Sequence, residues 1–246
     1  MSISLTSFSS HIRVVVVGAT GGIGRALVEH LLSNEQVDTV VGMSRGVATV
    51  KHRKYQHYLI DYNNEGSLVL AATHIAEPID IVLVATGFLH DEATLPEKSF
   101  KQLSHDNMMK YMLLNTIGPS LVAKHLLPKM RSTHKAVFAP LSARVGSISD
   151  NRLGGWYAYR ASKAALNMMV KTLAIEMQRR QANVIITSLH PGTVDTALSA
   201  PFQRNVEPEK LFTREFSAQC LLNVINQLES KDSGYCIAWD GKRISE

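Results

Sequence analysis

A β-branched run leads directly into a glycine-rich turn near the start of the chain. Residues 12–17 read Ile-Arg-Val-Val-Val-Val, a pattern typical of a strand buried on both faces. The turn contains Gly18, Gly22 and Gly24, and an apolar stripe with helical spacing begins at Ala26. A strand, a glycine turn and a helix in this order are typical of a dinucleotide site. The glycines let the backbone approach a pyrophosphate, and the helix N-terminus attracts its charge.

The rest of the chain alternates strands with helices. This alternation predicts an α/β fold, a single-domain doubly wound parallel sheet of the Rossmann type, with about seven strands and helices on both faces. We expect one domain over residues 1–246, in which residues 1–11 form a flexible lead and residues 194–212 a loop that covers the substrate. Beyond the first unit, the predicted strands are 37–43, 55–60, 79–85, 135–141, 183–189 and 235–239, and the predicted helices are 63–76, 104–130 with a kink at Gly118–Pro119, 156–180 and 213–228.

Tyr159 and Lys163 lie four residues apart in the helix predicted over 156–180. Residues at this spacing share one helix face, so an ammonium group is expected near a phenol. A nearby positive charge lowers the pKa of a phenol and lets it exchange a proton near neutral pH, as carbonyl reduction or alcohol oxidation requires. The same spacing also occurs by chance on many helices. Candidate groups at Gly18, Arg45 and Ser142 follow other strand ends, and their convergence on one rim of the sheet favours the catalytic interpretation.

The end of the second predicted strand carries Ser44 and Arg45. In dinucleotide-binding folds an acidic residue near this point holds the ribose of NAD, whereas an arginine accommodates the 2′-phosphate of NADP. There is no Asp or Glu between Asp38 and Asp61, so the sequence favours NADP(H) over NAD(H). Lys51 and Arg53 would add to the positive field, and the alternative is that Arg45 is an ordinary surface arginine.

Composition and charge argue against several other classes of protein. The formal charge of +5 comes from basic residues spread along the chain, so the short cluster Lys51–Lys54 is a weak basis for nucleic-acid binding, and none is predicted. No apolar run approaches the roughly 20 residues of a membrane span, and no signal-peptide pattern occurs. The two cysteines form no metal-binding motif. We therefore expect a cytoplasmic protein with no metal site and no membrane or nucleic-acid partner.

Taken together, these motifs resemble the short-chain dehydrogenase/reductase family over about residues 12–240. The likeness rests on the glycine loop Gly18–Gly24, on Tyr159-x-x-x-Lys163, and on Pro191–Gly192 after the sixth strand. A serine at a strand end and an asparagine in the preceding helix complete the pattern. A run of residues from Leu141 to Ser147 is also similar to a subgroup of small carbonyl reductases and a bacterial cell-contact signalling protein.

The resemblance implies a role for each matched residue. Tyr159 would be the general acid or base, Lys163 would lower its pKa and hold the nicotinamide ribose, and Ser142 would bind the substrate oxygen. Asn115 would order a water that continues a proton relay through Lys163. The cofactor-binding set implied is Gly18, Thr20, Gly22, Ile23, Gly24, Ser44, Arg45, Asp61, Ala85, Gly87, Tyr159, Lys163, Pro191, Gly192, Thr193, Val194 and Thr196.

Two departures from the family pattern affect the site. Residues 84–87 read Val-Ala-Thr-Gly where the family often has Asn-Asn-Ala-Gly. The spacing from Ser142 to Tyr159 is longer than usual, so Ser147 and Ser149 are alternatives to Ser142.

The sequence therefore predicts an NADP(H)-dependent oxidoreductase for an apolar carbonyl or alcohol, with possible assembly as a homodimer or homotetramer. The alternative is a catalytically idle nucleotide-sensing or signalling protein of the same fold. Apolar side chains such as Phe88, Trp156 and Phe202 stand in segments expected to line the substrate pocket.

Overall fold

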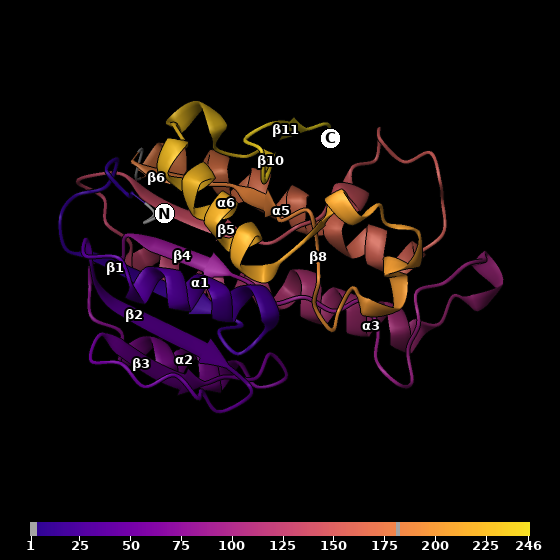
Figure 1. Cartoon of the computed structure of the whole chain (residues 1–246), viewed down its shortest axis with the longest axis horizontal. Coiled ribbons are helices and arrows are strands. Elements are labelled where there is room, and N and C mark those ends of the chain that lie inside the picture. The colour runs from indigo at the N-terminus through magenta and orange to yellow at the C-terminus, as the bar shows by residue number, and fades with distance from the viewer. Residues whose placement is uncertain (1–3, 181–182) are drawn as a thin grey trace.

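The core of the computed structural model, which describes residues 4–180 and 183–246, is a parallel sheet with strand order β3-β2-β1-β4-β5-β6 (Figure 1). Its first strand alternates between two cores: Val14 and Val16 enter one apolar cluster, and Val15 and Val17 enter the other. This explains the unbroken β-branched run, because both faces of the strand are covered. The strands are β1 (Ile12–Val17), β2 (Val37–Ser44), β3 (Tyr55–Leu59), β4 (Ile81–Val84), β5 (Ala136–Pro140) and β6 (Val184–Ile186).

The sheet continues beyond β6 after a local irregularity at Thr187. Strand β7 (Ser188–His190) pairs in parallel with β10 (Cys236–Ala238), and β11 (Arg243–Ile244) adds an antiparallel edge. The side chain of Thr187 donates to the carbonyl of Tyr235 at 2.7 Å, so the two parts of the chain are joined where β6 and β7 meet. The strand predicted over 235–239 is therefore the seventh in the spatial order. A small separate ladder pairs β8 (Thr193–Val194) with β9 (Leu211–Phe212).

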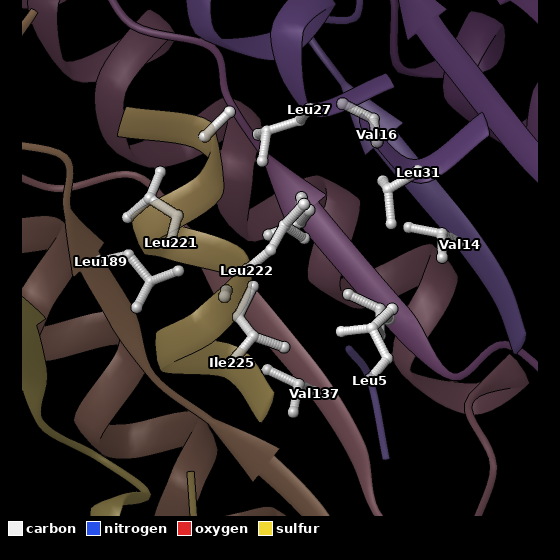
Figure 2. Close-up of a cluster of buried hydrophobic side chains, with 14 of the residues drawn as sticks. Leu5, Val14, Val16, Leu27, Leu31, Val137, Leu189, Leu221, Leu222 and Ile225 are labelled. Atoms are coloured by element: carbon white, nitrogen blue, oxygen red, sulfur yellow. The ribbon is translucent and has the colours of Figure 1, made fainter. Parts of the chain in front are cut away.

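Helices cover both faces of the sheet, as the doubly wound prediction requires. One cluster packs α1 and α6 against the sheet, and Figure 2 shows it with Leu27, Leu222 and Val137 among its members. The opposite cluster joins the sheet to α2, α4 and α5. The α-helices are α1 (Gly22–Leu32), α2 (Glu65–Thr73), α3 (His105–Met112), α4 (Gly118–Leu126), α5 (Tyr157–Arg180) and α6 (Arg214–Gln227). Short 3-10 turns are η1 (Phe100–Gln102), η3 (Leu127–Lys129), η4 (Arg144–Gly146), η5 (Ala200–Asn205), η6 (Pro208–Lys210) and η7 (Ser230–Asp232).

The helix predicted over 104–130 contains a π-helical turn. A π-helical turn, η2 (Leu113–Ile117), separates α3 from α4, so the irregularity precedes Gly118–Pro119 instead of lying at it. Gly118 packs directly under Tyr62, where an added Cβ would lie 2.1 Å from the ring. The glycine is thus needed for close packing of the helix, and the π turn contains Asn115.

Residues 4–11 differ from the flexible lead that we expected. Leu5 is fully buried in the cluster that holds α1 and α6 (Figure 2). Phe8 is also buried in this cluster. The ammonium of Lys135 lies 4.8 Å from the centre of the Phe8 ring and donates to carbonyl oxygens of Ile225 and Asn226 at the end of α6. The described part of the lead is therefore fixed to the core by apolar and polar contacts.

Candidate active site

The glycine loop between β1 and α1 has no room for side chains at two positions. Gly18 has a φ of +82°, and an added Cβ there would lie 2.9 Å from the backbone of Ala85. A Cβ on Gly24 would lie 2.1 Å from the carbonyl oxygen of Gly18. The loop is therefore compact, and the N-terminal turn of α1 starts at Gly22 without an acidic residue in its first turn. Such a terminus attracts a phosphate through its N–H groups and its dipole.

A cavity of about 270 Å³ opens beside this loop, and we call it the first cavity. Seven of the predicted cofactor residues line it: Gly18, Thr20, Ser44, Arg45, Asp61, Ala85 and Gly87. The remaining lining residues lie outside the predicted cofactor set: they are Gly21, Gly46, Ile60, Tyr62, Thr86, Leu114 and also Phe88, which we expected at the substrate pocket and which does not line the second cavity described below. Most of them adjoin predicted positions in the chain and belong to the same strand-end rim. Leu114 lies in the π turn, which no sequence signal indicated.

Polar contacts fix the outer part of the first cavity. Ser44 is buried and donates to the carbonyl of Gly46 at 2.8 Å, and its oxygen lies 3.1 Å from Nε2 of His57. Hydrogen bonds from the backbone and side-chain N–H groups of Asn63 lower the pKa of the Asp61 carboxyl. The positive charge of Arg45 also lowers this pKa, by a smaller amount. Arg45 is exposed at the rim. Within the sequence Val84–Gly87, which departs from the family pattern, the Thr86 hydroxyl meets the Tyr62 hydroxyl at 2.9 Å.

Tyr159 and Lys163 lie on one face of α5 and are both buried. The Lys163 ammonium donates to the carbonyl of Leu141 at 2.8 Å and lies 5.9 Å from the centre of the Tyr159 ring. The α5 helix thus brings the phenol and the cation together at the end of β5. Gly87 closes the other side, because a Cβ there would be 3.9 Å from the Lys163 nitrogen and from Oδ1 of Asn115.

The protonation of these groups differs from the expectation in one respect. Burial raises the pKa of Tyr159 to about 12, and burial lowers the pKa of Lys163 to about 8. Loss of solvation at this buried phenol outweighs the expected lowering of the tyrosine pKa by Lys163. At neutral pH the phenol therefore carries its proton, and the lysine is mostly charged.

Asn115 is completely buried and has a structural role. Its Oδ1 accepts from the Phe88 N–H at 2.7 Å, and its Nδ2 donates to the Phe88 carbonyl at 2.9 Å and to Ser162 Oγ at 3.0 Å. Ser162 in turn donates to the carbonyl of Tyr159 at 2.8 Å. The π turn thereby connects the segment after β4 to the helix that carries Tyr159.

Ser142 follows β5, and its hydroxyl is buried without a hydrogen-bond partner among residues 4–180 and 183–246. Its backbone N–H donates to the Leu189 carbonyl at 2.8 Å, which fixes the residue to β7. Of the two alternatives, Ser147 accepts from the Asp150 N–H, and neither Ser147 nor Ser149 lines the cavity that contains Tyr159. A buried hydroxyl normally has a partner, and of the three serines Ser142 is the one that lines the cavity with Tyr159.

A second cavity of about 550 Å³ contains both Ser142 and Tyr159. It is also lined by Ile23, Pro191, Gly192, Thr193, Val194 and Thr196 of the predicted cofactor set, whereas Gly22, Gly24, Asn115 and Lys163 line neither cavity. Gly22 still contacts this region, because an added Cβ would be 2.7 Å from Thr196 Cγ2. The glycine loop and the segment after β7 therefore meet between the two cavities.

The walls of the second cavity are only partly apolar. Trp156 packs edge-on against Phe202 at 5.0 Å and against Tyr159 at 6.0 Å between ring centres. The expected apolar surface is present, with Leu89, Leu153, Leu198 and Val206 beside these rings. Charged and titratable residues that the sequence analysis did not assign also line it: Arg144, Asp150, Arg152, Arg160 and His190.

His190 is the most buried of these added groups. Burial, together with the positive charge of Arg144, lowers the pKa of His190 to about 4. Its Nδ1 atom is buried and has no hydrogen-bond partner within the described parts of the chain. The imidazole is therefore neutral at physiological pH and adds no charge to the cavity.

Comparison with known proteins agrees with this architecture. The sequence profile of the short chain dehydrogenase family matches residues 13–207. The chain belongs to the short-chain dehydrogenase family. The crystal structure of an NADPH-bound carbonyl reductase from chicken fatty liver superposes with a TM-score of 0.84 at 24% identity, covering 98% of this chain and 96% of the other. This likeness supports the short-chain dehydrogenase fold.

Two curated relatives of this short-chain dehydrogenase are informative. The C-signal protein of Myxococcus xanthus is 31% identical over 142 residues, which are 58% of this chain and 80% of that protein. A benzil reductase from Bacillus subtilis is 26% identical over 220 residues, covering 89% of this chain and 88% of the other. The family match places this chain among the short-chain dehydrogenases, a class of oxidoreductases. No helix in the described residues has both the length and the apolar character for a membrane crossing.

Proposed function

We propose that this protein transfers a hydride between NADP(H) and a carbonyl or alcohol substrate. The observation that carries the proposal is the unpartnered Ser142 hydroxyl, buried in the same cavity as Tyr159. A carbonyl oxygen that accepted hydrogen bonds from both hydroxyls would be held near the carboxyl ends of the strands, where this fold binds its ligands. The NADPH-bound carbonyl reductase and the benzil reductase among the similar proteins support a carbonyl substrate.

In this mechanism Tyr159 gives its proton to the substrate oxygen during reduction. The raised pKa of Tyr159 keeps the proton on the phenol at neutral pH, so the residue is in the form that can donate a proton to a carbonyl oxygen. Ser142 orients the oxygen, and the charged Lys163 stabilises the phenolate that remains. The bound nicotinamide cofactor supplies the hydride chemistry.

The same proposal assigns the cofactor to the compact glycine loop and the first cavity. The excluded Cβ positions at Gly18 and Gly24 and the open terminus of α1 fit a pyrophosphate. Thr193 and Thr196 would contact the nicotinamide part, and Lys163 its ribose. Arg45 at the rim, with no acidic residue beside it on β2, supports a 2′-phosphate and therefore NADP(H).

Replacement of the phenol tests the catalytic assignment directly. We expect Tyr159→Phe to reduce kcat by about 10²- to 10⁴-fold with a carbonyl substrate, because the proton donor is lost, while NADPH still binds. The measurement is steady-state NADPH oxidation, with cofactor affinity measured separately by titration. Tyr157→Phe is the matched control, because Tyr157 begins the same helix but lies outside both cavities. Full turnover by Tyr159→Phe would exclude this mechanism.

The C-signal relative favours a second candidate, a signalling role that uses the same nucleotide site. In that case the protein would bind NADPH but turn over no carbonyl in a panel of aldehydes, ketones and quinones. Turnover of any member at a rate that depends on Tyr159 would instead favour the enzyme.

Self-association is a further part of the proposal. Exposed apolar side chains occur on α3 at Met108 and Met109 and on α5 at Met168 and Ile175. Such a surface suits a homodimer or homotetramer. Sedimentation analysis would distinguish these assemblies from a monomer.

A further inference from the structure

The second cavity carries more charge than an apolar substrate needs. Three arginines and one aspartate line it, namely Arg144, Asp150, Arg152 and Arg160, so its ionised side chains sum to +2. Arg144, Asp150 and Arg152 lie between Ser142 and Tyr159 in the sequence. The charges therefore stand on the stretch of chain that separates the two hydroxyls proposed to hold the reacting oxygen.

These three arginines differ in the hydrogen bonds and ion pairs that they form. Arg160 donates to the carbonyl of Gly155 at 3.0 Å and to that of Val145 at 3.4 Å, so its role is to fix the segment before α5. Arg144 contacts Asp150 at 3.3 Å, but both side chains are about half exposed, and such a pair contributes little stability. Arg152 forms no hydrogen bond or ion pair with residues 4–180 and 183–246, and it is exposed at the cavity mouth.

The apolar residues of the same cavity define where an anionic group can be placed. Trp156, Phe202 and Leu198 lie with Tyr159 in one apolar cluster, so the inner part of the cavity suits an aromatic or aliphatic body. Leu153, next to Arg152, also lines the cavity although it is almost fully exposed. A ligand whose carbonyl reaches Ser142 and Tyr159 would thus place its far end near the arginines of the mouth.

We infer that the preferred substrate is a carbonyl compound with an apolar body and a remote anionic group, a carboxylate or a phosphate, which Arg152 and Arg144 recognise. This inference rests on the proposed function for the position of the carbonyl, and it adds the charge of the substrate. Arginine suits this task because its planar guanidinium binds carboxylate and phosphate in a bidentate manner. Asp150 forms an ion pair with Arg144, but the summed charge of the side chains that line the cavity stays positive.

A matched pair of ketones separates charge from shape. The probes are 4-acetylbenzoate and its neutral methyl ester, and binding to the full chain is measured by calorimetry with and without NADP⁺, so that no turnover is required. We expect the wild type to bind the acid more tightly than the ester. Arg152→Met should lower the ratio of acid to ester affinity by about tenfold, in line with the loss of one charge-assisted hydrogen bond. Increasing salt should weaken binding of the acid and leave the ester unaffected.

Control variants test whether the effect belongs to the cavity mouth. Arg152→Lys keeps the charge and should retain part of the preference, and Arg144→Met should also reduce it. Arg179→Met removes an exposed arginine at the end of α5, outside the cavity, and should change nothing. Equal affinity of the wild type for acid and ester, no measurable binding of the acid, or an unchanged preference in Arg152→Met would each overturn the inference.

Turnover of the two ketones with NADPH then tests the proposed function independently. Selective binding of the acid without turnover of either ketone would count against the oxidoreductase and leave the anion site standing. Turnover of both with equal affinity would support the oxidoreductase and refute the anion site.

Discussion

Burial shifts the pKa values of Tyr159 and Lys163, which define the candidate active site, in opposite directions. Desolvation disfavours the phenolate of Tyr159 and the ammonium of Lys163 alike, so the pKa of one rises and that of the other falls. The carbonyl of Leu141 accepts from the lysine and helps it remain charged. Because the lysine pKa is about 8, the fraction of charged lysine falls as pH rises through that value. The sequence predicted that the two residues lie on one helix face. It could not predict the direction of the Tyr159 pKa shift, because that shift depends on how deeply the side chain is buried in the fold.

Arg45 is the residue on which the cofactor preference depends. We expect Arg45→Ala to weaken NADPH binding by about tenfold and to affect NADH much less, because only NADPH carries a 2′-phosphate for a charge-assisted hydrogen bond. Fluorescence titration of both cofactors measures the two affinities. Arg179→Ala is a control for general charge, since Arg179 is exposed at the end of α5 and lines neither cavity. Equal losses for NADPH and NADH would argue against a phosphate contact.

At the scale of elements, sequence patterns predicted the strands better than the connections. The β-branched runs located β1, β2 and β4 to within about two residues at each end, because buried parallel strands need continuous apolar residues. The division of the 104–130 helix escaped prediction, since Asn115 forms its hydrogen bonds with Phe88, a residue far away in sequence. The charged residues at the mouth of the second cavity were not predicted, for a similar reason. The segment between β5 and α5 is among those expected to line the substrate pocket, but nothing local to Arg144 or Arg152 indicates that charged side chains of this segment would do so.

The packing of α1 against its own glycine loop leads to a testable prediction at the scale of elements. Gly24→Ala would force a methyl group against the Gly18 carbonyl, so we expect a loss of about 1–3 kcal/mol in the free energy of unfolding and weaker cofactor binding. Chemical denaturation and NADPH titration measure the two effects. Gly66→Ala is the matched control, because the added Cβ in α2 would approach only the side chain of Asn64, at 3.0 Å. A Gly24→Ala variant as stable as wild type would contradict the close approach.

At the scale of the whole molecule, the described part of the lead belongs to the folded core. Leu5 lies between the sheet and the α1–α6 layer, and the expectation of a flexible lead failed because the Ser-rich composition hid two well-spaced apolar anchors. We expect Leu5→Ala to lower the free energy of unfolding by about 2–5 kcal/mol through the cavity that it leaves. Thermal denaturation measures this, with the exposed Thr6→Ala as the control. An unchanged melting temperature for Leu5→Ala would show that the lead is dispensable for stability.

The paired hydrogen bonds between Asn115 and Phe88 have a consequence for which amino acids the π turn can accept. With one acceptor and one donor, the carboxamide does for Phe88 what a peptide group of an adjacent strand would do. Asn115 is therefore a one-residue substitute for a sheet neighbour, placed where the strand ladder has ended. An ionised aspartate would keep the shape but present only acceptors, and would leave the Phe88 carbonyl facing negative charge. The geometry of the peptide beside the active site is thus encoded in a single side-chain amide.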